Sequence, residues 1–322
     1  MRNLILLSLC IVITPPGAAQ TYVTLFEDDF DSDTSADWLV FRGSASGMVD
    51  TTATFSYDYS ADGIPPASRS LGGTTRGLKL TANNDFAPGE AAGISLYPEG
   101  QHFSGNYRLT ADIWLNIPDV GTTEFINLGI NHTGTRVNYT ANNVEGTSSI
   151  TNATESDGFW FAVSGEGDAL RDYRSYIGTA TEPILLNAHP AYGTCAAGFP
   201  FNATDDTCAD NGNFQEPYLS WFPSPPYNFL GVPAGGQWAI AEVEQLDGTV
   251  TWRINGHVIL TRANLSGFTA GNIMLGYMDP FNSIASPASE SFGLIDNVKV
   301  EQILPSPTPV ISGTGQEWQD YR

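Results

Sequence analysis

The sequence predicts an all-β protein, a sandwich or barrel formed by one large domain. Short runs of alternating apolar and polar residues follow one another along the chain, and clusters of glycine, asparagine, aspartate and proline separate them. No long stretch repeats its apolar residues at the helical period of about 3.6. A single β domain can reach the size of this 322-residue chain.

The first 19 residues have the form of a secretory signal peptide. Arg2 gives a positive start, an apolar run extends over Leu4–Thr14, and the small residues Gly17–Ala19 follow. The apolar run is shorter than the roughly 20 residues that cross a bilayer as a helix. We therefore expect cleavage after Ala19, no membrane insertion, and a secreted, extracellular or cell-surface protein.

Strand patterns fill the expected domain, residues 20–304. The clearest is Tyr107–Asn116, where apolar residues from Tyr107 to Leu115 alternate with a second set that includes Trp114. A period of two places the first set on a core face and the second on an outer or ligand face. Seven further ranges have strand patterns: Tyr22–Phe30, Gly77–Ala82, Gly93–Tyr97, Glu124–Ile130, Gly158–Ser164, Asn272–Tyr277 and Phe292–Val300.

Two tight turns predict a meander over Trp238–Thr261. The pairs Asp247-Gly248 and Asn255-Gly256 are favoured two-residue turns of β-hairpins. Closing the first turn pairs Leu246 with Thr249, and a slip of one residue would mix apolar and polar faces. The resulting register places Ala241, Val243, Trp252 and Ile254 on one face, and Glu242, Glu244, Thr251 and Arg253 on the other.

The charge balance is strongly acidic. The chain has 13 basic and 35 acidic residues, a formal net charge of −22. Binding to nucleic acid or to an anionic membrane surface depends on clustered lysine and arginine. We therefore expect no nucleic-acid partner.

Two cysteines, Cys195 and Cys208, remain after removal of the signal peptide. An oxidising compartment favours a disulfide between them. A closed loop of this size stabilises a fold by roughly 3 kcal/mol, because it restricts the unfolded chain. The tail at residues 305–322 opens with a proline-rich and serine-rich run, and we expect it to be an irregular linker.

Several of these segments together resemble the concanavalin A-like lectin/glucanase superfamily. The matching segments are Trp238–Glu244 followed by Asp247–Gly256, which form the meander, and the opening and closing segments Phe26–Asp31, Gly276–Ser283 and Ile295–Val300. Over residues 24–303 the chain is similar to LamG-like secreted bacterial proteins. The resemblance implies a jelly-roll sandwich of two antiparallel sheets, one of them concave and often bearing the ligand site. Lectins, hydrolases, lyases and adhesive modules share this fold, so the fold alone does not settle the activity.

Aromatic residues close to polar groups are the candidate ligand-binding residues. Asp172 and Arg174 follow Trp160, and in a cleft they would bind sugar hydroxyls while Trp160 stacks on a ring. Trp160 fits packing on a neighbouring strand equally well. Trp221 belongs to the segment Phe214–Phe229, which fits either a rigid stacking platform or a cover over a sheet face. With Trp114 they support a secreted carbohydrate-binding, lectin-like protein, whose partner is a poly- or oligosaccharide.

Two alternatives remain open. The first is a polysaccharide-degrading enzyme, a glycoside hydrolase or lyase, in which Glu242 and Glu244 supply same-face carboxylates. The next same-face position is Leu246, so the third carboxylate typical of glycosidases with this fold is missing. Arg253 across the hairpin offers Glu242 an ion pair instead. The second alternative is a non-catalytic structural or adhesive extracellular protein.

Calcium is the expected ion, as a structural clamp and not as a catalyst. Acidic residues alternate between Asp29 and Asp37, but the glycine and glutamate of an EF-hand loop are not at the required positions. Because jelly-roll termini lie side by side, the resemblance suggests a site between Asp28 or Asp29 and Asp296.

Overall fold

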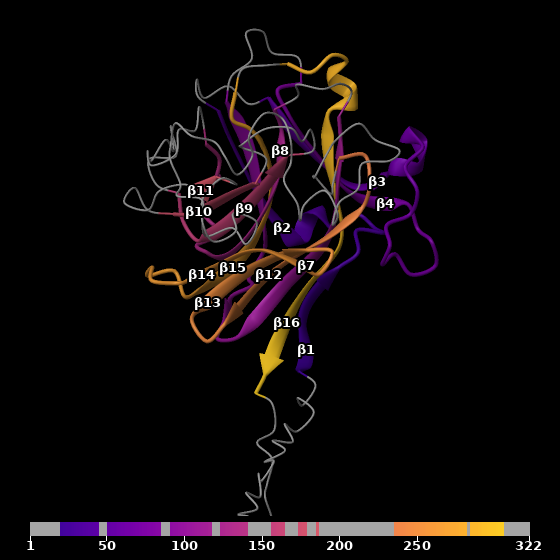
Figure 1. Ribbon diagram of the computed structural model, residues 1–322. Coiled ribbons are helices and arrows are strands. Elements are labelled where there is room, and N and C mark those ends of the chain that lie inside the picture. Colours follow the sequence, from indigo (N-terminus) through magenta and orange to yellow (C-terminus); the bar gives the residue numbers. More distant parts are fainter. Residues whose placement is uncertain are drawn as a thin grey trace, which may run out of the picture.

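The structure is a computed structural model in which the chain forms two antiparallel β-sheets packed face to face (Figure 1). Each sheet has eight strands. The structure describes residues 20–44, 50–84, 91–117, 123–140, 156–164, 173–178, 185–186, 235–281 and 284–305. The predicted signal peptide and nearly all of the predicted tail lie outside these ranges, so both stay predictions.

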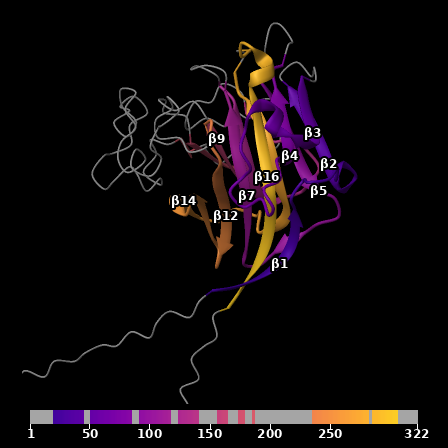
Figure 2. The same cartoon turned by 90° about the vertical axis from the view of Figure 1, so that its right-hand side faces the viewer.

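The first sheet contains both ends of the described domain. In spatial order its strands are β14 (His257–Ala263), β13 (Thr249–Ile254), β12 (Ala239–Leu246), β7 (Tyr107–Asn116), β16 (Phe292–Leu304), β4 (Arg76–Ala82) and β3 (Thr51–Asp58), and β1 (Thr21–Asp28) also pairs with β16. Thr21 pairs with Leu304, so the two ends lie side by side (Figures 1 and 2).

The second sheet covers the other side of the core. In spatial order its strands are β11 (Leu185–Leu186), β10 (Tyr173–Ile177), β9 (Phe159–Ser164), β8 (Phe125–His132), β15 (Ala270–Asp279), β5 (Ala92–Pro98) and β2 (Trp38–Ser44), and β6 (Phe103–Ser104) pairs with β15. Along the described strands, the chain changes sheet after β1, β2, β4, β6, β7, β11, β14 and β15. This alternation confirms the predicted two-sheet antiparallel jelly-roll sandwich.

Helical structure is confined to short turns in the described part of the chain. The 3-10 helices are η1 (Ser35–Asp37), η2 (Tyr59–Asp62) and η4 (Ala288–Glu290). Within the described ranges, no helix is long and apolar enough to cross a membrane.

The predicted strands and the hairpin register are confirmed. The bounds of β7 are those predicted, and the β12–β13 pairs include Leu246 with Thr249 and Glu242 with Arg253. Both turns of the meander have positive φ, at Asp247-Gly248 and at Asn255-Gly256, the conformation that favours these residue types. The sequence patterns did not predict β2, β3 or β10.

The core lies between the two sheets. Every second residue of β7 points into it, including Leu109 and Ile113, which are fully buried. From β13, Trp252 stacks on Phe161 of β9 with ring centroids 5.0 Å apart, so the two sheets are joined by aromatic packing. The outward-facing residues of each sheet do not belong to this core.

Candidate functional site

The outer face of the first sheet carries a group of ion pairs. Glu242 accepts bonds from Arg253, at 2.5 Å, and from Arg108, at 3.2 Å, while Glu244 accepts one from Arg253 at 3.0 Å. Arg108 also pairs with Glu301 at 2.7 Å. Both glutamates are thus neutralised by arginines across the strands. These contacts support the alternative account of Glu242 as an ion-pair partner of Arg253, and a catalytic role of the two glutamates stays an untested alternative.

Trp114 belongs to an apolar cluster on the same outer face. It packs with Tyr59, Ile64, Phe292 and Leu294, and its ring centroid is 5.8 Å from that of Trp238. Only 5% of Trp114 is exposed, so its surface is used for packing. Trp114 and Trp160 lie on different sheets, and a ligand-binding role of Trp114 stays a prediction.

Two of the three carboxylates expected to bind calcium, Asp28 and Asp296, have different surroundings. Asp28 accepts bonds from the Phe30 amide, the Thr34 hydroxyl and the Trp38 indole, each at 2.8 Å, on the inner side of the sheet edge. Asp296 instead faces the outer side of the first sheet. The structure therefore does not bring Asp28 and Asp296 together.

A pocket of about 780 Å³ opens beside the end of β1, and Asp28 and Asp29 contribute to its lining. Its two basic lining residues, Arg69 and Lys299, are paired with Asp112 and Glu301. Among the described residues, no group of three or more histidine, cysteine or acidic side chains is arranged to hold a metal ion. Calcium therefore stays a prediction without an assembled site.

Asp296 forms a buried hydrogen-bonded cluster of its own. Its carboxylate accepts bonds from the Tyr59 hydroxyl at 3.1 Å, the Ser70 hydroxyl at 2.9 Å and the Asn297 amide at 2.7 Å. Burial raises the pKa of Asp296 to about 7 against the effect of these bonds, and the charge of Asp112 raises it further.

The raised pKa of Asp296 predicts a pH-dependent stability. Because the folded protein holds this proton more tightly than the unfolded chain, its contribution to stability is lost as pH rises from about 4 to about 7. We expect Asp296→Asn to abolish the decrease in unfolding free energy that deprotonation of Asp296 causes, which is on the order of 2 kcal/mol at pH 8. Urea unfolding of both proteins at pH 5 and pH 8 measures it. If the unfolding free energies of the wild-type protein and the variant differ by the same amount at both pH values, the prediction is contradicted.

The outer face of the second sheet has a different character. Cross-strand register places Ser95, Gly276, Asn127, Ala162 and Arg174 in one row across β5, β15, β8, β9 and β10. The next row contains Met274, Gly129, Trp160 and Tyr176. The first row therefore contains mostly small residues. The second row has large aromatic residues where it crosses β9 and β10.

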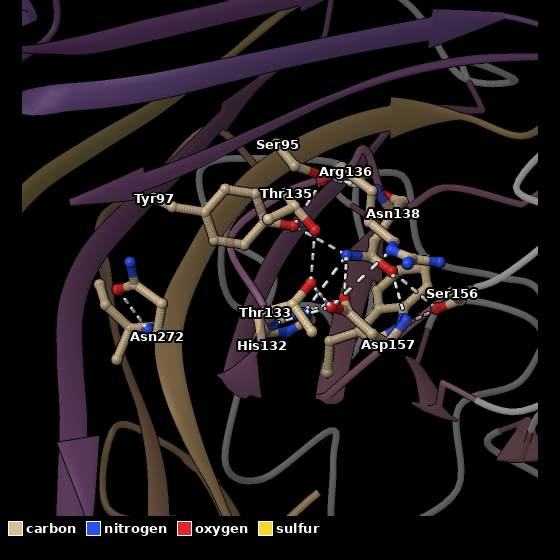
Figure 3. A network of polar contacts seen from close by, with 12 residues as sticks. Ser95, Tyr97, His132, Thr133, Thr135, Arg136, Asn138, Ser156, Asp157 and Asn272 are labelled. Carbon is tan, nitrogen blue, oxygen red and sulfur yellow. Dashed lines mark hydrogen bonds and ion pairs between the residues drawn. The ribbon is translucent and has the colours of Figure 1, made fainter. Parts of the chain in front are cut away.

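A buried polar network joins this face to the loop after β8 (Figure 3). Asp157 accepts bonds from His132 Nδ1 at 3.0 Å, the Thr133 amide at 2.8 Å and Asn138 Nδ2 at 3.0 Å, and also from the Thr133 hydroxyl. Burial alone would raise the pKa of Asp157, but the bonds from His132, Thr133 and Asn138 outweigh it and hold that pKa well below its usual range. Asp157 is therefore ionised at neutral pH.

Asn138 continues the network toward Trp160. Its Nδ2 also donates to the Tyr97 hydroxyl at 2.8 Å, and its Oδ1 accepts from the Ser156 hydroxyl at 2.8 Å. Ser156 in turn accepts a bond from the Trp160 indole at 3.1 Å. The network therefore fixes the position of Trp160 on the sheet.

The structure brings two of the predicted ligand residues together. Trp160 stacks on Tyr176 with ring centroids 3.9 Å apart, and Arg174 lies over the Phe125 ring at 3.8 Å. Trp160 and Arg174 occupy neighbouring rows of the same face, but both are fully buried, so neither forms an open surface. The other predicted residues, Asp172, Trp221, Cys195 and Cys208, lie outside the described residues, and their roles stay predictions.

Two buried side chains of β8 have polar atoms without a partner. Neither amide atom of Asn127 has a hydrogen-bond partner, and neither has Nε2 of His132. Asn127 is 0% exposed and His132 1%. Buried polar atoms are nearly always paired, so these two side chains indicate a group that the protein itself does not supply. The sequence patterns did not indicate either residue, although each is polar and lies in or next to a predicted strand.

Comparisons with known proteins return similar solved structures only. No family model matches the chain, and a search of curated proteins finds no match. Among solved structures, a Bacillus subtilis protein of unknown function with a galectin-like fold is 13% identical, covers 88% of this chain and 99% of its own, and has a TM-score of 0.47. An endo-β-1,3-glucanase from Pyrococcus furiosus is 10% identical, with coverages of 90% and 99% and a TM-score of 0.46.

A carbohydrate recognition domain, that of Emp46p in a potassium-bound form, is 10% identical, covers 84% of this chain and 90% of its own, and has a TM-score of 0.41. The solved structures thus include lectin-like domains and glucanases. At such identities and TM-scores they say nothing about the ligand or the activity of this chain.

Proposed function

We propose that this chain is a secreted or cell-surface carbohydrate-binding, lectin-like protein, and that its poly- or oligosaccharide ligand contacts the outer face of the second sheet. The unpaired amide of Asn127 is the observation that carries the proposal. It lies in the row next to Trp160 and Tyr176, which form an aromatic stack. Sugar sites combine such apolar rings with a few polar groups that orient the ligand.

The alternatives have less support from the described residues. The hypothesis of a polysaccharide-degrading enzyme depended on Glu242 and Glu244 as catalytic carboxylates. Both are held in ion pairs with arginines, which weakens this hypothesis. The hypothesis of a structural or adhesive protein does not explain why the amide of Asn127 is unpaired. Secretion itself rests on the predicted signal peptide.

Glycan-array binding, run beside reducing-sugar release, tests the proposed function. We expect the processed protein to bind oligosaccharides, because the unpaired amide of Asn127 offers a ligand hydrogen bonds, and to release no sugar, because Glu242 and Glu244 are held in ion pairs. Release of reducing sugar would favour the enzyme instead. The absence of both binding and release would leave the structural protein as the better account.

A further inference from the structure

Two buried carboxyl groups lie opposite each other at the end of the sandwich where β16 begins, away from the paired chain ends (Figure 1). The β8–β15 register pairs Ile126 with Tyr277, and continuing it by two positions places Glu124 opposite Asp279. Residues that are directly opposite in an antiparallel pair have Cβ atoms about 5 Å apart. Ile126 and Tyr277 are core residues, so alternation turns both carboxyl groups toward the space between the sheets.

Asp279 is surrounded by groups that stabilise a negative charge. It is 0% exposed and accepts bonds from Asn83 Nδ2 at 2.6 Å, the Thr123 hydroxyl at 2.8 Å and the Phe281 amide at 2.9 Å. The positive charge of Arg174, on β10, also lowers the pKa of Asp279, although burial raises that pKa more. Of the two carboxyl groups, Asp279 therefore accommodates a negative charge better.

Glu124 has fewer such groups around it. Its Oε1 accepts a bond from the Ser291 hydroxyl at 2.7 Å, and in the described part of the chain its Oε2 has no hydrogen-bond partner. Burial and the charge of Asp279 raise the pKa of Glu124 to about 7, which Ser291 and nearby backbone amides oppose only in part. The Tyr277 hydroxyl, 3.5 Å from that of Ser291, stays neutral, because burial raises its pKa well above the ordinary value.

We infer that Glu124 and Asp279 form a pH-sensitive latch, in which one proton on Glu124 keeps this end of the sandwich closed and its loss loosens the strands that meet there. Deprotonation places two negative charges opposite each other, and like charges in that position destabilise a strand pair. One of them is on a carboxylate with an unpaired buried oxygen. This carboxylate gains water when the start of β8 separates from the start of β16, which Ser291 precedes. The inference goes beyond the proposed function and does not depend on carbohydrate binding.

The direction of the pH effect follows from the raised pKa of Glu124. The closed protein holds this proton more tightly than an open or unfolded chain, in which the pKa has its ordinary value of 4.5. The stabilisation is therefore complete below that value and is lost as pH rises through about 7. Between pH 5 and pH 8, we expect the equilibrium constant for opening to rise by roughly tenfold to a hundredfold.

Hydrogen exchange at pH 5 and pH 8 tests the latch, with protection factors corrected for the intrinsic exchange rate at each pH. In the wild-type protein, we expect amides at the start of β8, the end of β15 and the start of β16 to lose protection by roughly tenfold to a hundredfold. Amides of the β12–β13 hairpin should change much less. Glu124→Gln keeps an acceptor for Ser291 but has no charge, so the strand ends should be protected almost equally at both pH values.

Three further variants separate Glu124 from other acids. Asp279→Asn removes the opposing charge, so we expect the loss of protection to persist but to have its midpoint at lower pH, because Glu124 stays buried. Glu290→Gln is the matched control, since it changes an exposed carboxylate next to Ser291 and should leave the pH dependence unaltered. In an Asp296→Asn background, Glu124→Gln should have the same effect as in the wild-type protein.

Three results would overturn the inference. If the strand ends of the wild-type protein are protected equally at pH 5 and pH 8, no proton is released there. If Glu124→Gln loses protection with pH as the wild-type protein does, the proton belongs to another group. If the β12–β13 hairpin loses as much protection as the strand ends, the pair contributes to global stability and does not act as a local latch. The first and third results need only the wild-type protein, so they remain decisive if a variant does not fold.

Discussion

Replacing Asp157 with alanine is expected to lower the free energy of unfolding by about 3–5 kcal/mol. The carboxylate is buried and accepts bonds from His132, Thr133 and Asn138. Alanine leaves these donors buried without a partner, and each unpaired donor costs about 1–3 kcal/mol. Reversible urea unfolding, followed by tryptophan fluorescence, measures the change.

Two controls separate this effect from a general loss of charge. Asp157→Asn keeps one acceptor oxygen, so we expect a smaller loss of stability than with alanine. Glu99→Ala removes an exposed carboxylate and should leave the unfolding midpoint nearly unchanged. If Asp157→Ala unfolds at the wild-type urea concentration, the network does not hold the loop after β8 in place.

Local patterns predicted much of this fold. The strand Tyr107–Asn116 and the hairpin pairing of Val243 with Trp252 depend on alternation and on turn residues that lie within a few positions of one another. β10, over Tyr173–Ile177, was missed because it is short and its alternation is broken by the buried Arg174. Such a strand forms through tertiary packing and not through its own pattern.

The candidate site was harder to predict, because its geometry depends on contacts between distant segments. Alternation showed that Trp114 and Trp160 each point to the opposite face from the residues next to them in the sequence. It does not show which sheet a strand joins. The bond between His132 and Asp157 spans 25 positions and forms only when the chain returns from β8 to β9. The sequence likewise cannot show that Asn127 lacks a hydrogen-bond partner, because this depends on all the residues that surround it in the fold.

The same reasoning holds for the calcium site that the resemblance suggested. The resemblance correctly implied that the chain ends lie side by side, since Asp28 pairs with Val298 in the β1–β16 ladder. The register of β16 against β7 shifts between Asp296 and Lys299, a bulge that no sequence pattern indicated. Val298 points into the core, whereas Asp296 points outward, so Asp28 and Asp296 lie on different faces.

On the first sheet, the largest effect is expected from Arg69→Met. The guanidinium of Arg69 donates to Asp112 at 2.8 Å, to the Thr110 hydroxyl at 3.1 Å and to the Asn297 carbonyl at 3.1 Å. Asp112 is fully buried, and among the described residues its other hydrogen bond comes from Asn297 Nδ2, at 2.8 Å. Removing one partner of a buried ion pair costs about 3–5 kcal/mol, so we expect urea unfolding to show a loss of that size.

A second substitution shows whether the unpaired charge causes that loss. Asp112→Asn in the Arg69→Met background removes the charge at nearly the same volume, and we expect it to recover part of the lost stability. The single variant should also lose more stability at pH 8 than at pH 5, because the unscreened charge of Asp112 acts on Asp296, whose pKa that charge already raises. If the double variant is less stable than Arg69→Met, then Arg69 contributes through packing over the sheet and not by compensating Asp112.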